Sequence, residues 1–264
     1  MISYCIAAYR PILCKLLVQD LVRKTSVPYE ILVWNNTGDI AFENFLVEQS
    51  RAGARVNIVG SSADNIGMRA YQHLFKAAQY PLIVQIDDDV VCVSRNIAQI
   101  CTALFAKHPK VRQIVSDIWV DDLTWGNKPP KTHYKPWNDG DQLLRGPVDG
   151  WFSVMHKSVM PLILEKVKFG KFFSLGLEVR AMLEKHGLLG LLCQQFKVFH
   201  VVGGPYLSYY GMLEAEGRKW EMLKGPGAGR KFVEKMSKGV PPRDVLEKKV
   251  QGIYAALDVM GASA

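Results

Sequence analysis

Three consecutive carboxylates, Asp87, Asp88 and Asp89, are the residues of this 264-residue chain most suited to chemistry. They directly follow an apolar run, Pro81 to Ile86, that is typical of a buried parallel strand. Like charges repel, and burying them is costly unless a cation or hydrogen-bond donors compensate them. Open α/β sheets bind ligands at the carboxyl ends of their strands, and Mg²⁺ or Mn²⁺ prefers oxygen ligands that include substrate phosphates. The triplet therefore predicts a metal and diphosphate site at a sheet edge.

The same triplet also fits a second interpretation, an acidic turn ahead of a helix. The apolar periodicity predicts a helix over residues 97–107, and either Asp89 or Ser94 could cap its N-terminus through a side-chain oxygen. Spacing alone leaves both interpretations open.

The elements that would position the triplet are expected to form an α/β fold, because strand and helix signals alternate through the first half of the chain. Strands are expected at residues 2–8, 29–34, 55–59, 81–86 and 111–116, and helices at 11–24, 40–49, 65–78 and 97–107. Right-handed crossovers would join these strands into one sheet. The pattern thus predicts a Rossmann-like, mostly parallel central sheet flanked by helices.

The second half of the chain begins with a long loop, residues 117–147, whose aromatic side chains are expected either to stack on a ligand or to pin the loop down. These side chains are Trp119, Trp125, Tyr134 and Trp137. A strand (148–155), two helices (157–167 and 175–186) and an extended segment (193–202) are expected next. Residues 205–264 predict a helical extension that packs on the core, since they carry many aromatic residues.

Composition and charge narrow the classes of protein to consider. The net charge of +8, with Lys and Arg dense between residues 218 and 249, favours anionic partners such as nucleotides, nucleic acid or phospholipid surfaces, the last through peripheral membrane contact, without choosing among them. The five cysteines are scattered among apolar residues and are expected to be reduced core thiols. Because no apolar stretch reaches the roughly 18 residues of a membrane-spanning helix and no signal-peptide pattern is present, a cytoplasmic protein is expected.

Four segments of the chain, taken in order, carry a family resemblance. They are Ser3-Tyr4-Cys5-Ile6-Ala7-Ala8-Tyr9-Arg10, Glu30-Ile31-Leu32-Val33-Trp34-Asn35-Asn36, Asn65-Ile66-Gly67 and Gln85-Ile86-Asp87-Asp88-Asp89. Together they resemble the nucleotide-sugar domain of family 2 glycosyltransferases with the GT-A fold, well over residues 2–115 and more loosely over 148–202. The resemblance implies a GT-A catalytic domain at 1–204, with a nucleotide-sugar half (1–116) and an acceptor half (117–204). A helical C-terminal extension at 205–264 would follow.

The resemblance implies which residues contact a nucleotide-diphosphate sugar, linked to UDP, GDP or dTDP. Ala8, Tyr9 and Arg10 occupy the place of the family segment that lies under the nucleotide. Asn35 and Asn36 stand where the family usually has an Asp that contacts the base. An amide both donates and accepts hydrogen bonds, so the base preference stays open.

Further donor contacts are implied in the loop before the third expected helix and in the second half. Asn65, Gly67 and Arg69 match the loop that passes the nucleotide, although Asn65 could simply cap its helix. Trp151 lies on a strand that lines the acceptor pocket in the family, and its ring could stack on a sugar. The resemblance also allows a basic tail segment to close over the diphosphate, although a solvated helix face is simpler; its residues are Arg218, Lys219, Lys224, Arg230 and Lys231.

The resemblance assigns the metal site within the acidic motif. Asp87 would lie on the ribose side, Asp89 would be the main metal ligand and Asp88 would assist. A second ligand is implied at His200, which follows the extended segment. Manganese accepts imidazole more readily than magnesium does, so both Mn²⁺ and Mg²⁺ are candidates.

A general base must take the proton of the attacking hydroxyl in an inverting transferase. The family usually supplies it from a pair of acids at a helix start, and this chain has a single acid there, Glu178. Glu178 is the first candidate, with a structural ion pair as its alternative role, and Asp149 is the second.

Together these observations predict a metal-dependent inverting glycosyltransferase of the hexosyltransferase type. It would move a sugar from a nucleotide-diphosphate donor to a hydroxyl of a saccharide or other acceptor, with no nucleic acid as partner. A nucleotidyltransferase is one alternative, although it would carry a Gly-rich basic loop where this chain has Ala7 to Pro11. A non-catalytic carbohydrate- or nucleotide-binding module is another, since Glu178 stands alone.

Overall fold

The computed structural model describes residues 1–124, 129–138, 140–170 and 175–260. The strands are β1 (Ile2–Ala8), β2 (Tyr29–Asn35), β3 (Val56–Ser61), β4 (Leu82–Ile86), β5 (Val90–Val93), β6 (Val111–Ile118), β7 (Lys135–Pro136), β8 (Leu143–Arg145), β9 (Phe152–His156) and β10 (Leu189–His200). The α-helices are α1 (Pro11–Lys24), α2 (Ile40–Arg51), α3 (Arg69–Ala77), α4 (Ile97–Lys107), α5 (Met160–Lys166), α6 (Leu175–Lys185), α7 (Gly204–Tyr209), α8 (Leu213–Lys224), α9 (Ala228–Met236) and α10 (Arg243–Val259). Short 3₁₀ turns lie at Lys131–His133 and Lys157–Val159.

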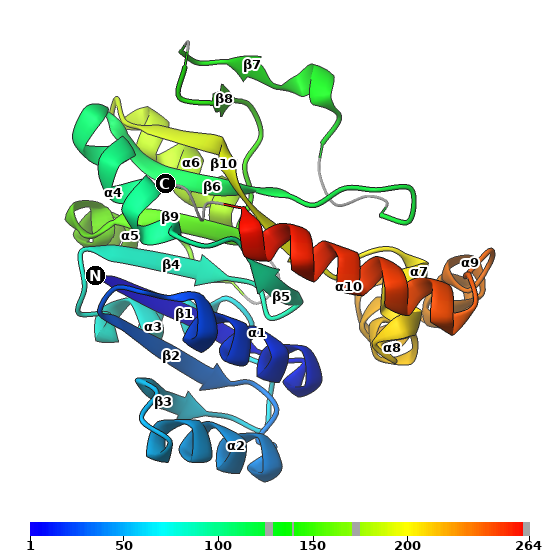
Figure 1. Cartoon of the computed structure of the whole chain (residues 1–264). Helices are drawn as coiled ribbons and strands as arrows, with labels where there is room; N and C mark the ends of the chain where they lie inside the picture. Colours follow the sequence, from blue (N-terminus) through cyan, green and yellow to red (C-terminus); the bar gives the residue numbers. More distant parts are fainter. Residues whose placement is uncertain (125–128, 139, 171–174, 261–264) are drawn as a thin grey trace.

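One mixed sheet forms the centre of the molecule (Figure 1). Its strand order is β3-β2-β1-β4-β9-β6-β10-β8-β7, and β5 pairs with β10. The pairs β1–β2, β1–β4, β2–β3 and β6–β10 are parallel, whereas β9 runs antiparallel between β4 and β6. The main strands β1 to β4, β6 and β10 therefore point the same way, which confirms the predicted mostly parallel α/β sheet.

Helices cover both faces of this sheet. Alternate residues of a strand point to opposite sides, and here both sides carry apolar side chains that pack against helices. On one face, Ile2, Tyr4 and Ile6 pack with apolar residues of α1, α2 and α4. On the other face, Cys5 and Ile83 pack with residues of α3, α5 and α6. All five cysteines are free and buried, as the sequence predicted.

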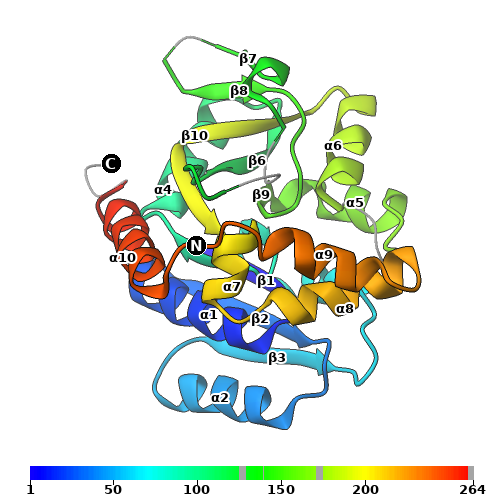
Figure 2. The ribbon, with the colours of Figure 1, turned by 90° about the vertical axis from the view of Figure 1, so that its right-hand side faces the viewer.

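The C-terminal helices lie partly on the core and partly beyond it. Val250, Ile253 and Leu257 of α10 are buried in a third cluster with Leu13 and Phe199. Figures 1 and 2 show α7, α8 and α9 beyond the carboxyl ends of β1 and β4. The tail thus packs on the core through α7 and α10. The helices α8 and α9 lie near the carboxyl end of β4, the strand that the acidic triplet follows.

The expected start of α4 at residue 97 is confirmed, whereas its two expected caps and the expected start of α3 are wrong. The strand β5 follows the triplet directly, and α4 starts later with Asn96 at its N-cap position, so neither Asp89 nor Ser94 caps it. Likewise α3 begins at Arg69, not at Asn65. The preceding loop cannot be helical because Gly67 has a φ of 61°, in the left-handed region.

An ionic network that is buried at Lys24 and Asp20 but exposed at Arg23 joins α10 to α1. The Lys24 ammonium group lies 3.1 Å from Asp20 and 2.9 Å from Asp258, and its side chain is 1% exposed. Asp258 also pairs with Arg23 at 2.9 Å. The hydrogen bond from Arg23 is the largest of the effects that lower the pKa of Asp258 to about 2.

Asp258→Asn is expected to destabilise the fold by about 1 kcal/mol at neutral pH, because it removes the charge that Arg23 and Lys24 share. An unfolded aspartate has a pKa of about 4. Because folding lowers the pKa of Asp258 to about 2, the ionised carboxylate stabilises the fold fully above pH ~4, and this stabilisation is lost as the pH falls towards 2. Urea unfolding at pH 7, 4 and 2 should show the difference from wild type shrinking across this window. Glu247→Gln, an exposed change on the same helix, should show no such trend.

Candidate active site

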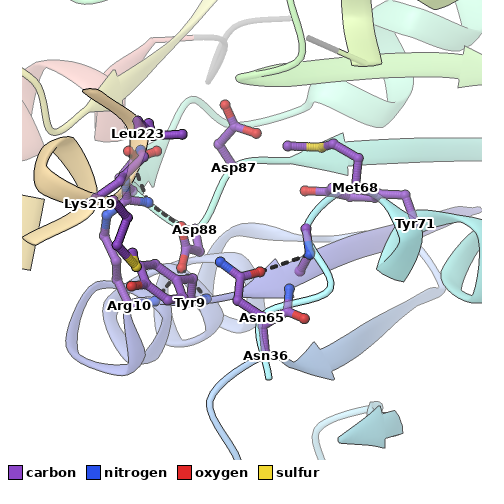
Figure 3. A pocket seen from close by; sticks show the side chains of 14 residues that line it. Tyr9, Arg10, Asn36, Asn65, Met68, Tyr71, Asp87, Asp88, Lys219 and Leu223 are labelled. Atoms are coloured by element: carbon purple, nitrogen blue, oxygen red, sulfur yellow. Dashed lines mark hydrogen bonds and ion pairs between the residues drawn. The ribbon is translucent and has the colours of Figure 1, made fainter. Parts of the chain in front are cut away.

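A cavity of about 280 Å³ lies at the carboxyl ends of β1, β2 and β4 (Figure 3). Segments far apart in the sequence build its wall, namely the end of β1, the residue after β2, the loop before α3, the acidic triplet and one side of α8. The lining residues are Ala7, Tyr9, Arg10, Asn36, Asn65, Gly67, Met68, Tyr71, Asp87, Asp88, Asp89, Lys219, Met222 and Leu223. Most of the residues that the sequence predicted to bind the nucleotide are therefore brought together here.

Four predicted nucleotide-binding or sugar-binding residues are not part of this lining. Ala8 is fully buried, and Arg69 is exposed at the start of α3. Asn35 is also fully buried, and its amide group bonds to Glu43 at 2.9 Å. Trp151 is 5% exposed, and its indole N–H donates to the Ser116 carbonyl at 2.9 Å, so its ring packs in the core. Their roles in binding stay predictions.

A potential metal site lies beside the cavity. One ligand atom from each of Asp87, Asp89 and His200 lies within 4.8 Å of the others. His200 Nε2 is 2.8 Å from Asp89 Oδ1, while His200 Nδ1 is buried and has no hydrogen-bond partner in the part of the chain that the structure describes. Two carboxylates and an imidazole fit a divalent ion such as Mn²⁺.

The strand β5 brings His200 to the acidic motif, although the two are far apart in the sequence. β5 follows the triplet and pairs antiparallel with the end of β10, with a register shift between Phe199 and His200. The Val201 N–H then donates to the Asp89 carbonyl at 2.7 Å. This short strand therefore fixes His200 against Asp89.

Arg10 compensates part of the negative charge of the triplet. Its guanidinium group lies 2.6 Å from Asp88 and 3.2 Å from Asp89. Asp88 also accepts hydrogen bonds from the backbone N–H groups of Tyr9 and Arg10, at the N-terminus of α1. Asp88 thus stabilises the start of α1 as well as the charge of Arg10.

The three carboxyl groups have different proton affinities. Burial, and next the negative charge of Asp89, raise the pKa of Asp87 to about 7. Burial alone would also raise the pKa of Asp89, but the positive charges of Arg10 and His200 hold it well below its ordinary value. Asp87 is therefore the carboxyl group of the metal cluster whose charge the protein compensates least.

The helix α8 supplies three site residues that the sequence reasoning did not single out, Glu216, Met222 and Leu223, and one that it did, Lys219. Glu216 lies 2.6 Å from Arg10 Nε, and Lys219 lines the cavity with Met222 and Leu223. Lys219 is the member of the predicted basic tail segment that reaches the lining. No local pattern indicates the link between Glu216 and Arg10, which are 206 positions apart.

The two candidate bases lie in different surroundings. Asp149 is half-buried just before β9, and Trp151, two residues further on, accepts a hydrogen bond on its carbonyl from the Asp87 N–H at 3.0 Å, so the backbone near Asp149 lies beside the acidic triplet. Glu178 is exposed in the first turn of α6. A Cβ at Gly176 would come within 2.3 Å of the Asp149 carbonyl carbon, so the start of α6 packs directly on Asp149. Both residues therefore belong to one corner of the fold.

The aromatic loop is held by its own residues where the structure describes it. The Tyr134 hydroxyl donates to the Pro147 carbonyl at 2.8 Å, and Trp137 packs edge-on against His108 at 4.9 Å. Trp119 is partly buried against the third hydrophobic cluster. Trp125 lies outside the described residues. Tyr134 and Trp137 thus pin the loop, which was one of the two predicted roles.

Solved structures resemble this chain, whereas no family model and no curated protein matches its sequence. A mannosyltransferase, PcManGT from Pyrobaculum calidifontis with GDP-Man and Mn²⁺, has a TM-score of 0.56 at 9% identity, over 99% of this chain and 84% of its own. GalNAc-T7 with UDP, GalNAc and Mn²⁺ has a TM-score of 0.59 at 12% identity, and the match covers 98% of this chain and 59% of the GalNAc-T7 chain. Residues 1–349 of TarS from S. aureus have a TM-score of 0.55 at 12% identity, and the match covers 88% of this chain and 68% of that TarS chain. In the longer TarS structure, the match covers 41% of the TarS chain.

These similarities confirm the fold predicted from the sequence. The chain has the GT-A fold, a central mostly parallel sheet flanked by helices. Within the described residues no helix is long and apolar enough to cross a bilayer.

Proposed function

We propose that this protein transfers a sugar, of the hexose class, from a nucleotide-diphosphate donor to an acceptor hydroxyl. The observation that carries the proposal is the cluster of Asp87, Asp89 and His200 beside a cavity at the carboxyl ends of parallel strands. That position is the ligand-binding edge of open α/β sheets. The solved neighbours with this fold include complexes with GDP-Man, UDP and UDP-GlcNAc.

Charged residues gather at one side of the cavity, around the acidic triplet. Asp87, Asp89 and His200 would hold Mn²⁺ or Mg²⁺, which when bound would offset the charge developing on the departing nucleoside diphosphate. Arg10 and Lys219 add positive charge at the same place. Arg10, Lys219 and the bound metal ion would therefore stabilise the negative charge of the nucleoside diphosphate as it leaves.

An inverting reaction needs a base on the acceptor side of the reacting carbon. We propose Asp149 ahead of Glu178, because Asp149 lies two residues before Trp151, whose carbonyl accepts a hydrogen bond from the Asp87 N–H, whereas Glu178 is exposed on α6. The identity of the acceptor and peripheral membrane contact stay predictions.

A panel of nucleotide sugars, each incubated with and without Mn²⁺ or Mg²⁺, tests this function. We expect release of the nucleoside diphosphate from at least one donor, loss of that release with a chelator, and recovery when the cation is restored. Tight nucleotide binding without release from any donor or acceptor would instead identify a binding module. Formation of a nucleotide sugar and pyrophosphate from a nucleoside triphosphate and a sugar phosphate would identify a nucleotidyltransferase.

A further inference from the structure

Three carboxylates surround the guanidinium group of Arg10, which is buried at the edge of the cavity. Its Nη1 atom lies 2.6 Å from Asp88 and 3.2 Å from Asp89. Its other edge faces α8, where Nε and Nη2 lie 2.6 Å and 2.5 Å from one carboxylate oxygen of Glu216. Figure 3 marks the contact between Arg10 and Asp88 with a dashed line. Arg10 is therefore held from two sides, and its longest ionic contact is the one with Asp89.

Asp89 takes part in two groups of charges at once. Its Oδ1 atom lies 2.8 Å from His200 Nε2 in the metal cluster, whereas its Oδ2 atom faces Arg10. A guanidinium group and a divalent cation are both attracted by the charge of a carboxylate, and they repel each other. A closer contact between Arg10 and Asp89 would therefore weaken the binding of an ion, so the position of Arg10 affects the metal site.

Glu216 holds the edge of Arg10 that points away from Asp89. Its carboxylate contacts Nε and Nη2, whereas Asp89 contacts Nη1. Glu216 is 8% exposed, and among the described residues its other ion pair is with Lys219, at 3.5 Å. Two short N–H contacts to one buried carboxylate make a strong charge-assisted pair. Without this pair, the guanidinium group would be shared by the acids of the triplet alone.

The packing of the C-terminal helices fixes the place of Glu216. A Cβ atom at Gly217 would lie 2.7 Å from the Val233 side chain, and one at Gly229 would lie 2.4 Å from the Gly217 carbonyl oxygen. The helices α8 and α9 therefore touch at the residue next to Glu216. Close packing resists displacement, so Glu216 reaches Arg10 from a backbone that is itself held in position.

We propose that Glu216 is a positioning residue of the metal site, although it lies outside the cluster of metal ligands. By holding Arg10 at its far edge, Glu216 keeps the charge of Asp89 available to a divalent cation. The inference rests on the metal-dependent function proposed above. It assigns α8 a role in loading the metal site as well as in lining the cavity.

Glu216→Gln is the first test, because it keeps the size of the side chain and an oxygen for Arg10 but removes the charge. We expect Mn²⁺ alone, measured by the electron paramagnetic resonance signal of the free ion, to bind about five- to tenfold more weakly than to wild type. UDP and GDP without metal should bind at least as tightly as to wild type, because the cavity becomes more positive. Thermal unfolding of each variant is measured alongside.

The two ligands separate a positioning role from a merely structural one. A structural role would weaken Mn²⁺ and metal-free nucleotide together, and that result would overturn the proposal, as would unchanged Mn²⁺ affinity. Glu214→Gln is the matched control, since it makes the same change at an exposed position of α8. Its Mn²⁺ affinity should stay within about twofold of wild type, because an exposed charge is screened by solvent.

Arg10→Gln tests the same link from the other end and does not depend on the stability of the Glu216 variant. Removal of the guanidinium group should tighten Mn²⁺ binding by about five- to tenfold, which a loss of structure would not do. Unchanged or weaker binding would overturn the proposal. Adding Glu216→Gln to Arg10→Gln should change the Mn²⁺ affinity by less than about threefold, because Glu216 acts through Arg10. A loss as large as in the single Glu216 variant would show that Glu216 acts by its own charge, and would exclude the positioning role.

The wild-type titrations separate this inference from the function on which it rests. If the wild-type protein binds Mn²⁺ and a nucleoside diphosphate but the variants fail as described, the inference alone is wrong. If the wild-type protein binds neither Mn²⁺ nor a nucleoside diphosphate, the proposed function is wrong as well.

Discussion

Asp89→Asn is expected to abolish the effect of Mn²⁺ on nucleotide binding and to lower kcat/KM by about 10²–10³-fold or more, as removal of a key electrostatic group does in other active sites. Asp89 shares the metal cluster with Asp87 and His200 and has a carboxyl pKa held well below its ordinary value, so it is ionised at neutral pH. The amide keeps the shape but removes the charge. Titration of nucleotide with and without Mn²⁺, together with steady-state kinetics, measures both effects.

The fold should tolerate this change, because Arg10 keeps its contacts with Asp88 and Glu216. Asp244→Asn, an exposed change in the first turn of α10, is the matched control and should retain wild-type binding. If the Asp89 variant still bound nucleotide more tightly with Mn²⁺ than without it, the assignment of the metal site would be wrong.

Asp149→Asn is expected to lower kcat by about 10²–10⁴-fold, the usual contribution of a general base, with little change in donor affinity. The asparagine oxygen can still accept the hydrogen bond that the Gly150 N–H donates to Asp149, so the local backbone should not move. Steady-state kinetics, with donor binding measured separately, tests both points.

Glu178→Gln is the matched comparison, because it makes the same chemical change at the other candidate base. Its kcat should stay within a few-fold of wild type, since Glu178 is exposed on α6. A large loss of kcat in this variant, with near-normal turnover of the Asp149 variant, would restore the sequence-based preference for Glu178.

The strands in the first half of the sheet could be predicted because most of their residues are apolar and helix patterns or turn signals separate them. The end of such a run also located the acidic triplet, since a charged residue after a buried strand marks the sheet edge. The direction of β9 could not be predicted, because local pattern is the same for a parallel and an antiparallel strand. The strand β5 could not be predicted either, because it has only four residues and follows the triplet without a turn signal.

The finer structure of the site depended on details that local pattern does not contain. Adjacent residues at a strand end point to opposite sides, so Asn35 faces α2 whereas Asn36 lines the cavity. The sequence could nominate this pair but could not choose between its members. The contribution of α8 depends on the contact of Glu216 with Arg10, which only the tertiary structure creates.

The contact between Arg10 and Glu216 has a consequence for dissecting this protein. Cutting the chain after residue 204, the boundary that the sequence suggested, would remove Glu216 together with the cavity-lining side chains of Lys219, Met222 and Leu223. The remaining piece would keep Asp87, Asp89 and His200 but would lose this side of the cavity together with the positive charge of Lys219. Residues 213–224 are therefore needed to complete the cavity, and a piece that ends before them would not reproduce it.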